Sequence, residues 1–355
     1  MRHTDLLLVV LRSQTTASSL TLRQWDILIS QARRTNLLAR LAILLSNANL
    51  LDNLPDSPRN HLESALLMSK RQDRAMRWEL DCIRQALHRV QRPVILLKGA
   101  AYLAAGLPNA SGRMFGDVDI LVPKENLPKV EAELLIHGWQ ETVTDSYDQR
   151  YYRAWMHEIP PLQHNLRQTV IDVHHSILPE TARVCVNIGY MFEAAHPLGN
   201  SGLHILCPVD MVLHSAAHLF HEGEFNNALR DLCDLDSLFR DFSSKDADFW
   251  NQLINRAELT GLTRPMYYAL RYSNRFLETP VPSEIIRLAQ RFSPFLVNIM
   301  DSAYHYAFRP LESTQSSRVS LARYFLYIRS HWLRMPIHLL AYHLVRKFFI
   351  RSFVD

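Results

Sequence analysis

Hydrophobic and polar positions follow three different patterns along the 355 residues. In the first 90 residues, apolar side chains recur at the spacing typical of amphipathic helices. From 93 to 177, short apolar runs are bounded by Gly, Pro and polar turns, which predicts buried strands. Beyond Pro179 the helical spacing returns. The pattern predicts an α+β fold in which a central sheet is flanked by helical regions.

These patterns divide the chain into an N-terminal helical cap (1–90), a central α+β region (91–180) and a C-terminal helical region (181–355). A linker is expected at 55–58 within the cap. The predicted strands are 94–97, a strand that carries Asp117 and Asp119, 139–144, 151–159 and 169–177. The clearest predicted helices are 59–90, 124–137, 209–221 and 225–239.

Two acidic residues stand two positions apart in the second predicted strand. Successive strand side chains point to opposite faces, so Asp117 and Asp119 share a face while Val118 points away. Magnesium prefers oxygen ligands and is often held by one or two carboxylates together with substrate phosphates. The pair therefore predicts a magnesium site for phosphoryl or nucleotidyl transfer, against the simpler alternative of a solvated strand edge.

The last predicted strand, TVIDVHHSI, supplies a third acid. Asp172 can face the other two carboxylates if the strands are neighbours. There it could ligate a metal or take a proton from an attacking hydroxyl. His174 shares its face, and could orient an acceptor, bond a phosphate or serve as an ordinary hydrogen-bonded strand residue. His175 points the opposite way and is expected to be structural.

A second group of candidates surrounds the Lys98-Gly99 turn. A helix is predicted directly after it, from Ala100, and free N–H groups at a helix start favour anions such as nucleotide phosphates. Gly99 would let the backbone approach a phosphate without a Cβ atom in the way. Arg113, in the loop before the acidic strand, could close over the metals and bind phosphate in bidentate fashion, or simply pair with a nearby carboxylate.

The segments LLKGAAYL, GRMFGDVDILV and VIDVHHSI together resemble the nucleotidyltransferase superfamily with a DNA polymerase β-like palm. More narrowly, they resemble a largely uncharacterised bacterial family of that superfamily. The resemblance implies a mixed palm sheet, Mg²⁺ or Mn²⁺, and a nucleoside triphosphate such as ATP, with release of pyrophosphate. It implies catalytic and metal-binding roles for Asp117, Asp119 and Asp172. The acceptor (a small molecule, peptide, protein or RNA end) stays open.

The same resemblance places the nucleotide near the glycine turn and its neighbours: Lys98, Gly99, Ala100, Arg113 and His174. The broader superfamily usually has Gly-Ser or Gly-Gly at this turn, whereas this chain has Gly99-Ala100. Without a hydroxyl, the phosphate contacts would come from backbone donors and Lys98.

Two alternatives belong to other classes. A scaffold that binds nucleotide without catalysis would keep the palm as a frame, although the intact set of three acids argues against it. His214, His218 and His221 lie on one predicted helix face, a spacing that can bind zinc in a metal hydrolase. No HExxH or His-Asp pair accompanies them. These histidines are rather expected to pack against the palm or line an acceptor cleft. Asp231 and Asp234 are expected to pair with Arg230, Arg240 or a helix end.

The segment 318–355 interleaves cations with aromatic residues and has no acid before Asp355. Such a stretch could lie on a membrane surface, bind a partner protein or RNA, or dock on its own domain.

Composition adds little to this picture. The net charge of +4 is too small to indicate a nucleic-acid-binding protein by itself. Four widely spaced cysteines suit free thiols in a reducing cytoplasm, and no apolar segment has the length of a membrane span or of a signal-peptide core. We therefore expect a cytoplasmic protein, or one held peripherally at the membrane.

Overall fold

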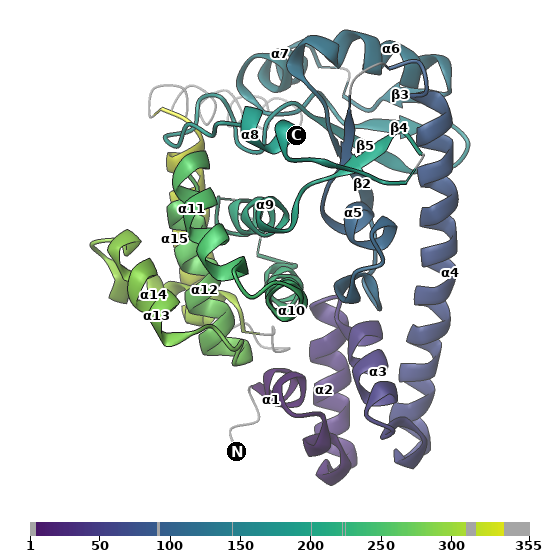
Figure 1. Ribbon diagram of the computed structural model, residues 1–355. Coiled ribbons are helices and arrows are strands. Elements are labelled where there is room, and N and C mark those ends of the chain that lie inside the picture. Colours follow the sequence, from purple (N-terminus) through teal and green to yellow (C-terminus); the bar gives the residue numbers. More distant parts are fainter. Residues whose placement is uncertain are drawn as a thin grey trace, which may run out of the picture.

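The computed structural model describes residues 5–90, 93–143, 145–199, 201–221, 223, 225–309 and 317–336. A mixed sheet lies between two groups of helices (Figure 1). In this view α6 and α7 lie above the sheet, α5 and α9 lie below it, and the long α4 runs along its side. The fold is therefore the predicted α+β architecture, with helices from both ends of the chain around a central sheet.

Within the described residues, the sheet has seven strands in the order β3-β4-β5-β2-β1-β7-β6. β2 pairs in parallel with β5, and β1 in parallel with β7; the other neighbours are antiparallel. The strands are β1 (Val94–Leu96), β2 (Asp117–Leu121), β3 (Trp139–Glu141), β4 (Leu162–His164), β5 (Val170–His174), β6 (His196–Pro197) and β7 (Leu203–Ile205).

The centre of the sheet is fixed by the apolar residues between the candidate site residues. Val118 and Ile120 of β2 and Ile171 and Val173 of β5 are at most 1 % exposed. Because strand side chains alternate, burying this face leaves the acidic residues together on the other face. The expectation that the strands of Asp119 and Asp172 are neighbours is confirmed by the parallel β2–β5 ladder.

The N-terminal helices form a support below the sheet and beside it in Figure 1. Helix α2 begins with a capping box, in which the Thr21 hydroxyl accepts from the Gln24 backbone and the Gln24 side chain bonds back to Thr21. The linker expected at 55–58 is wrong, because α4 already begins at Asp56, and a proline is tolerated in a first helical turn. The elements are α1 (Leu6–Arg12), η2 (Gln14–Ser19), α2 (Leu22–Arg34), α3 (Leu38–Asn47), η3 (Leu51–Asn53) and α4 (Asp56–Ala86).

Two further differences concern the strands. The segment expected to be a strand at 151–159 is mostly helical, as α7 (Ser146–Trp155). Its aromatic residues suggested a strand, but Tyr151 and Trp155 are four positions apart and contact each other on one helix face. The short strands β6 and β7 lie beyond Pro179, where only helix was expected. The sheet thus draws on residues from both sides of position 180, and the three-region division stays a prediction.

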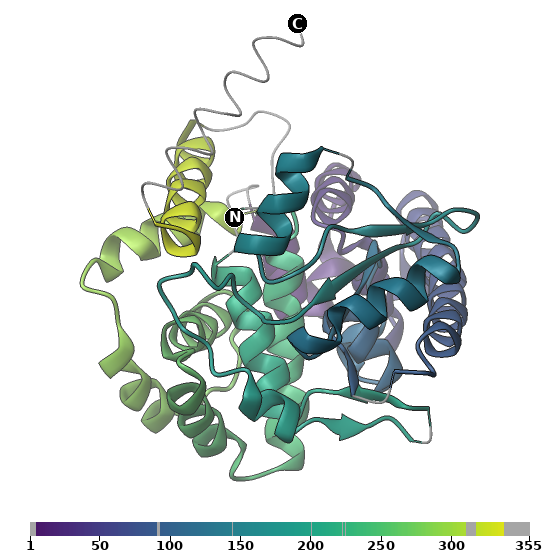
Figure 2. The same ribbon diagram turned by 90° about the horizontal axis from the view of Figure 1, so that it is seen from above.

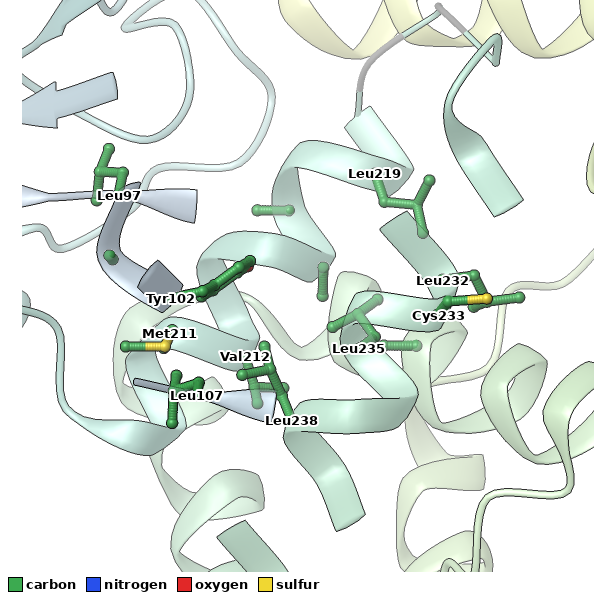
Figure 3. Packing of buried hydrophobic residues seen from close by; sticks show 14 of the residues in the cluster. Leu97, Tyr102, Leu107, Met211, Val212, Leu219, Leu232, Cys233, Leu235 and Leu238 are labelled. Carbon is green, nitrogen blue, oxygen red and sulfur yellow. The ribbon is translucent and has the colours of Figure 1, made fainter. Parts of the chain in front are cut away.

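The remaining helices complete the core. The central helices are α5 (Lys98–Ala104), η4 (Pro108–Ala110), η5 (Lys124–Asn126), α6 (Leu127–Ile136) and α8 (Gly189–Glu193). The C-terminal helices are α9 (Pro208–His221), α10 (Ala228–Lys245), α11 (Phe249–Thr260), α12 (Thr263–Leu277), α13 (Ser283–Ala289), η6 (Gln290–Phe292), α14 (Val297–Ala307) and α15 (Ser317–Arg334). Figure 3 shows Tyr102 of α5 close to Met211 and Val212 of α9, with Leu235 and Leu238 of α10 to their right.

Helix α15 packs against the domain rather than standing apart from it, as Figure 2 also shows. Two of its arginines turn inward: Arg329 donates to the carbonyl of Phe220 and Arg334 to that of His221, both at the end of α9. These contacts satisfy carbonyl groups that a helix end leaves open. Of the predicted basic segment, 337–355 lies outside the described residues. Across the described part of the chain, no helix has the length and apolarity needed to cross a membrane.

Candidate functional site

The site centres on acidic residues of two adjacent strands. Asp119 and Asp172 are direct partners in the β2–β5 ladder, so their side chains leave the sheet on the same face. Asp117 lies two residues earlier in β2 and is exposed, whereas Asp119 is buried. The structure therefore places the three carboxylates on one face of the sheet, with Asp117 exposed, Asp172 partly buried and Asp119 buried.

Asp119 is held by two cationic or potentially cationic groups. Its Oδ1 atom lies 3.0 Å from Lys98 Nζ and 3.0 Å from His174 Nε2. Burial alone would raise the pKa of Asp119, but Lys98 and His174 outweigh it and hold the pKa well below its usual value. Asp119 is therefore a permanent carboxylate. Both of these contacts use Oδ1, so Oδ2 is the oxygen available to a further ligand.

Asp172 has the opposite environment. Burial, followed by the charges of Asp119 and Glu158, raises its pKa to about 7, with His174 opposing. Its Oδ1 atom is buried without a hydrogen-bond partner in the described part of the chain. A buried carboxylate oxygen without a donor is costly, and a bound cation would remove that cost. On this observation Asp172 fits a divalent cation, although the oxygens of Asp117, Asp119 and Asp172 do not all lie within 4.8 Å of one another.

The Lys98-Gly99 turn lies at the same end of the sheet as Asp117. The Leu97 amide donates to the Asp119 carbonyl at 3.0 Å, which continues the β1–β2 pairing and sets the start of α5 beside the beginning of β2. Leu97 at the N-cap offers no side-chain acceptor to the first amides of α5. The amides of Gly99 and Ala100 thus start a helix near the acids, although α5 has only seven residues.

Arg113 was expected to lie in a flexible loop, but its side chain is buried. It is 8 % exposed, donates from Nε to Asp234 Oδ2 at 2.9 Å, and lies over the ring of Phe115. A Cβ atom at Gly99 would collide with the Arg113 guanidinium and come within 2.9 Å of Phe115 Cδ1. The space beside Gly99 is therefore filled by Arg113, so in this structure the glycine admits a side chain rather than a phosphate.

His174 lies deeper than expected for a group that contacts substrate. It is 4 % exposed, with Nε2 toward Asp119 and Nδ1 3.3 Å from Glu158 Oε2. Burial alone would lower the pKa of His174, but Asp119 and Glu158 raise it. Glu158, which bridges β5 opposite His174, was not among the residues that the sequence singled out. Its position as the single acid of the stretch YYRAWMHEIPP gave no spacing signal.

The histidines of α9 divide into two groups. His218 lowers the pKa of Asp119, and burial followed by Lys98 lowers the pKa of His214 well below its usual value, so both lie near the acidic site. His221 instead lies near Arg329 and Arg334, and burial with these charges lowers its pKa to about 3. The three do not come together as a metal site in the described residues, which leaves the zinc-hydrolase alternative without support. The site-lining role expected for them suits His214 and His218.

Two large cavities lie away from the acids. One, of about 710 Å³, is lined by Pro93, Pro123 and His175, at the end of the sheet opposite to Asp117. The other, of about 620 Å³, lies between the N-terminal helices and α10, near Asn109 and Arg240. The acidic site is therefore not part of either cavity, and Asp117 is its exposed member.

A family model described as an uncharacterised nucleotidyltransferase matches residues 21–278. This match covers most of the chain, so the protein belongs to that nucleotidyltransferase family. No curated protein and no solved structure matches the chain. The family match runs from α2 to the end of α12 and includes every residue of the acidic site.

Proposed function

We propose that the protein is a magnesium-dependent nucleotidyltransferase that transfers a nucleotide from a nucleoside triphosphate such as ATP to an acceptor hydroxyl, with release of pyrophosphate. One observation carries this proposal. Asp119 and Asp172 are side by side on parallel strands, and Asp172 has a buried oxygen without a donor next to other carboxylates. Purely structural acids are normally compensated, as Asp234 is, so the uncompensated group supports a cation site.

In this proposal, Asp117, Asp119 and Asp172 would hold Mg²⁺, with Mn²⁺ as a substitute. When bound, the metal supplies charge neutralisation at the triphosphate and at the leaving pyrophosphate. The acceptor oxygen attacks the α-phosphorus while the bond to pyrophosphate breaks. As an alternative to its role as a ligand, Asp172 could take the proton that the hydroxyl loses, because its pKa in the metal-free protein is about 7. Lys98 and the first amides of α5 are the proposed phosphate contacts, because Arg113 is engaged with Asp234.

The acceptor side stays a broad proposal. His214 and His218 bring imidazole groups toward the acids from α9, a position suited to orienting an acceptor hydroxyl. Small molecules, peptides, proteins and RNA ends all carry such hydroxyls. We propose that the reaction takes place in the cytoplasm, with the segment 318–355 as a contact to a membrane surface or partner.

The test is magnesium-dependent nucleotide binding and transfer. Asp117→Ala is expected to abolish both while leaving the fold intact, because Asp117 is exposed and makes few packing contacts. Asp119→Asn serves as the second variant, since it keeps the volume of a buried side chain. Asp81→Ala, which removes an exposed acid of α4, is the matched control. Transfer at the wild-type rate in either site variant would contradict the assignment.

One observation favours a second candidate, a nucleotide-binding scaffold without catalysis. Lys98 and His174 already neutralise Asp119, which weakens the need for a metal there. Two experiments distinguish the enzyme from the scaffold. Calorimetry with ATP and magnesium measures binding, and incubation of the protein with the four labelled nucleotides and cell extract detects transfer. Binding without any pyrophosphate release or labelled product favours the scaffold, and a labelled product identifies the acceptor.

A further inference from the structure

We propose that His157, Glu158 and His174 form a second metal site, for Zn²⁺, beside the acidic site and separate from it. One potential ligand atom from each residue lies within 4.8 Å of the others, and no other such group of His, Cys, Asp or Glu occurs in the described residues. The proposal concerns the metal content of the protein. It holds whether or not the chain transfers nucleotides.

The backbone places these three side chains together. Glu158 forms an isolated antiparallel bridge with His174, and the amide of His175 donates to the His157 carbonyl at 2.8 Å. The segment 157–158 therefore runs along the end of β5 as a short extension of the sheet. The rings of His157 and His174 lie 5.2 Å apart, centre to centre. Two separate backbone contacts thus hold the three side chains together. Their spacing in the sequence does not match a regular metal-binding motif.

The distances suit zinc. Zinc–nitrogen and zinc–oxygen bonds of about 2.0–2.2 Å in a tetrahedron separate neighbouring ligand atoms by roughly 3.3 Å. Glu158 Oε2 and His174 Nδ1 are already 3.3 Å apart. The remaining ligand atom belongs to His157 and lies within 4.8 Å of the other two, so the set would contract when zinc binds. Two histidines and one glutamate are a known zinc ligand set that leaves one position open.

The other nitrogen of His174 has the partner that a zinc-binding histidine needs. If Nδ1 binds the metal, Nε2 must carry the proton, and Nε2 lies 3.0 Å from Asp119 Oδ1. A metal-bound histidine that donates its second N–H to a carboxylate has its ring orientation fixed and its basicity raised. Asp119 would thus serve the two sites in different ways: Oδ1 positions His174, and Oδ2 faces the proposed magnesium.

The charge of the region also favours a further cation. The negative charges of Asp119, Glu158 and Asp117 all act on Asp172. Among these acids, Asp119 is paired with Lys98. An ion at Glu158 would reduce the repulsion that Asp172 experiences. Imidazole ligands select a transition metal over magnesium, which favours oxygen, so the two ions would sort by ligand type.

The competing explanation needs no metal: a protonated His174 could bridge Glu158 and Asp119 through two hydrogen bonds. That explanation gives His157 no part. Zinc binding that depends on His157 therefore distinguishes the two.

The experiment uses the full chain, stripped with EDTA and titrated with Zn²⁺ against a competing chelator, without nucleotide. One equivalent of zinc is expected, and His157→Ala and Glu158→Gln should each weaken binding by at least about 100-fold. His88→Ala removes an exposed histidine of another region and should change nothing. Asp117→Asn should also keep full zinc affinity, although it is expected to lose magnesium-dependent nucleotide binding.

Substitution with Co²⁺ provides the second readout, because its visible absorption reports the ligands. The wild-type spectrum should change in His157→Ala and stay unchanged in His88→Ala, with circular dichroism confirming that each variant is folded. Equal zinc affinity in wild type and His157→Ala would overturn the proposal, as would the absence of any bound equivalent. Loss of zinc binding in Asp117→Asn would merge the two sites and overturn their separation.

Discussion

Asp234 and Asp172 each place a carboxylate in the interior of the protein, and their surroundings differ. Asp234 of α10 is 3 % exposed and lies between two arginines, with Arg40 Nη2 at 2.6 Å and Arg113 Nε at 2.9 Å. Burial would raise its pKa, but Arg40 and Arg113 together lower it. Asp172 of β5 has no such partner for its buried Oδ1, and acidic neighbours help to raise its pKa to about 7.

The contrast separates a structural acid from a candidate functional one. A fully paired buried charge holds helices together and has no capacity left for a ligand. An underpaired carboxylate destabilises the empty protein and is retained where a ligand or proton must be bound. The charge balance around each residue, rather than the residue type, therefore identifies the site.

The largest expected effect comes from breaking the paired cluster, which consists of Asp234, Arg40 and Arg113. Asp234→Asn leaves Arg40 and Arg113 buried without their counter-ion, and should lower the free energy of unfolding by about 3–5 kcal/mol. Urea denaturation followed by circular dichroism measures it. Asp231→Asn is the control: this acid pairs with Arg230 at the edge of the same helix, and a change of about 1 kcal/mol or less is expected. Equal effects of the two substitutions would contradict the structural role given to Asp234.

Removing the underpaired acid should have the opposite sign. In the metal-free protein Asp172 binds its proton more tightly folded than unfolded, because its pKa is about 7 against an unfolded value near 3.9. The folded state thus holds more protons between about pH 4 and 7, so the contribution of Asp172 to stability falls as pH rises through this window. Above pH 7 its ionisation costs on the order of 4 kcal/mol.

Asp172→Asn is therefore expected to be more stable than wild type by several kcal/mol at pH 8 in EDTA, and by only about 1 kcal/mol at pH 4.5. Urea titrations at both pH values measure the difference. Added Mg²⁺ should stabilise the wild type at pH 8 and leave the variant nearly unchanged, since an ion that binds the folded state adds stability. A variant less stable than wild type at pH 8 in EDTA would show that Asp172 has a partner after all.

A smaller effect tests how the paired cluster is joined to the site. Gly99→Ala places a methyl group against Arg113 and Phe115, so these side chains must shift. The shift of Arg113 is costly because the arginine is paired with Asp234. We expect a loss of about 1–3 kcal/mol from overpacking, partly offset by the better helix propensity of alanine. Gly116→Ala is the matched control, because nothing lies within 4 Å of its added Cβ atom. Thermal unfolding of both variants checks the prediction, and equal midpoints would refute it.

The sequence predicted those parts of the site that depend on strand alternation. Asp119 and Asp172 each lie between buried apolar residues, so their common face followed once the two strands were neighbours. The neighbour relation itself rested on family resemblance, since no local pattern specifies which strands pair. The helices α9 and α10 were similarly evident from their apolar spacing.

The parts that failed depend on contacts between distant segments. Arg113 lies in a loop as expected, but its burial could not be foreseen because its partner, Asp234, lies 121 positions away. Glu158 went unnoticed because its bridge to His174 follows an irregular segment after α7. Strand β7 has only three residues. They form a strand because they pair in parallel with β1, and their own sequence does not predict it. Tertiary pairing of this kind leaves no periodic signal in the chain.

The pairing of β7 with β1 has a consequence for how this protein can be cut or recombined. Only Leu206 and Cys207 separate β7 from α9, so the helix that carries His214 and His218 leaves the sheet directly from a strand in it. A fragment that stops near residue 180 would lose that strand and bare one edge of β1. In chimeric proteins, the sheet and α9 should therefore be transferred together as one segment. Substitutions meant to change the acceptor should be made inside that segment.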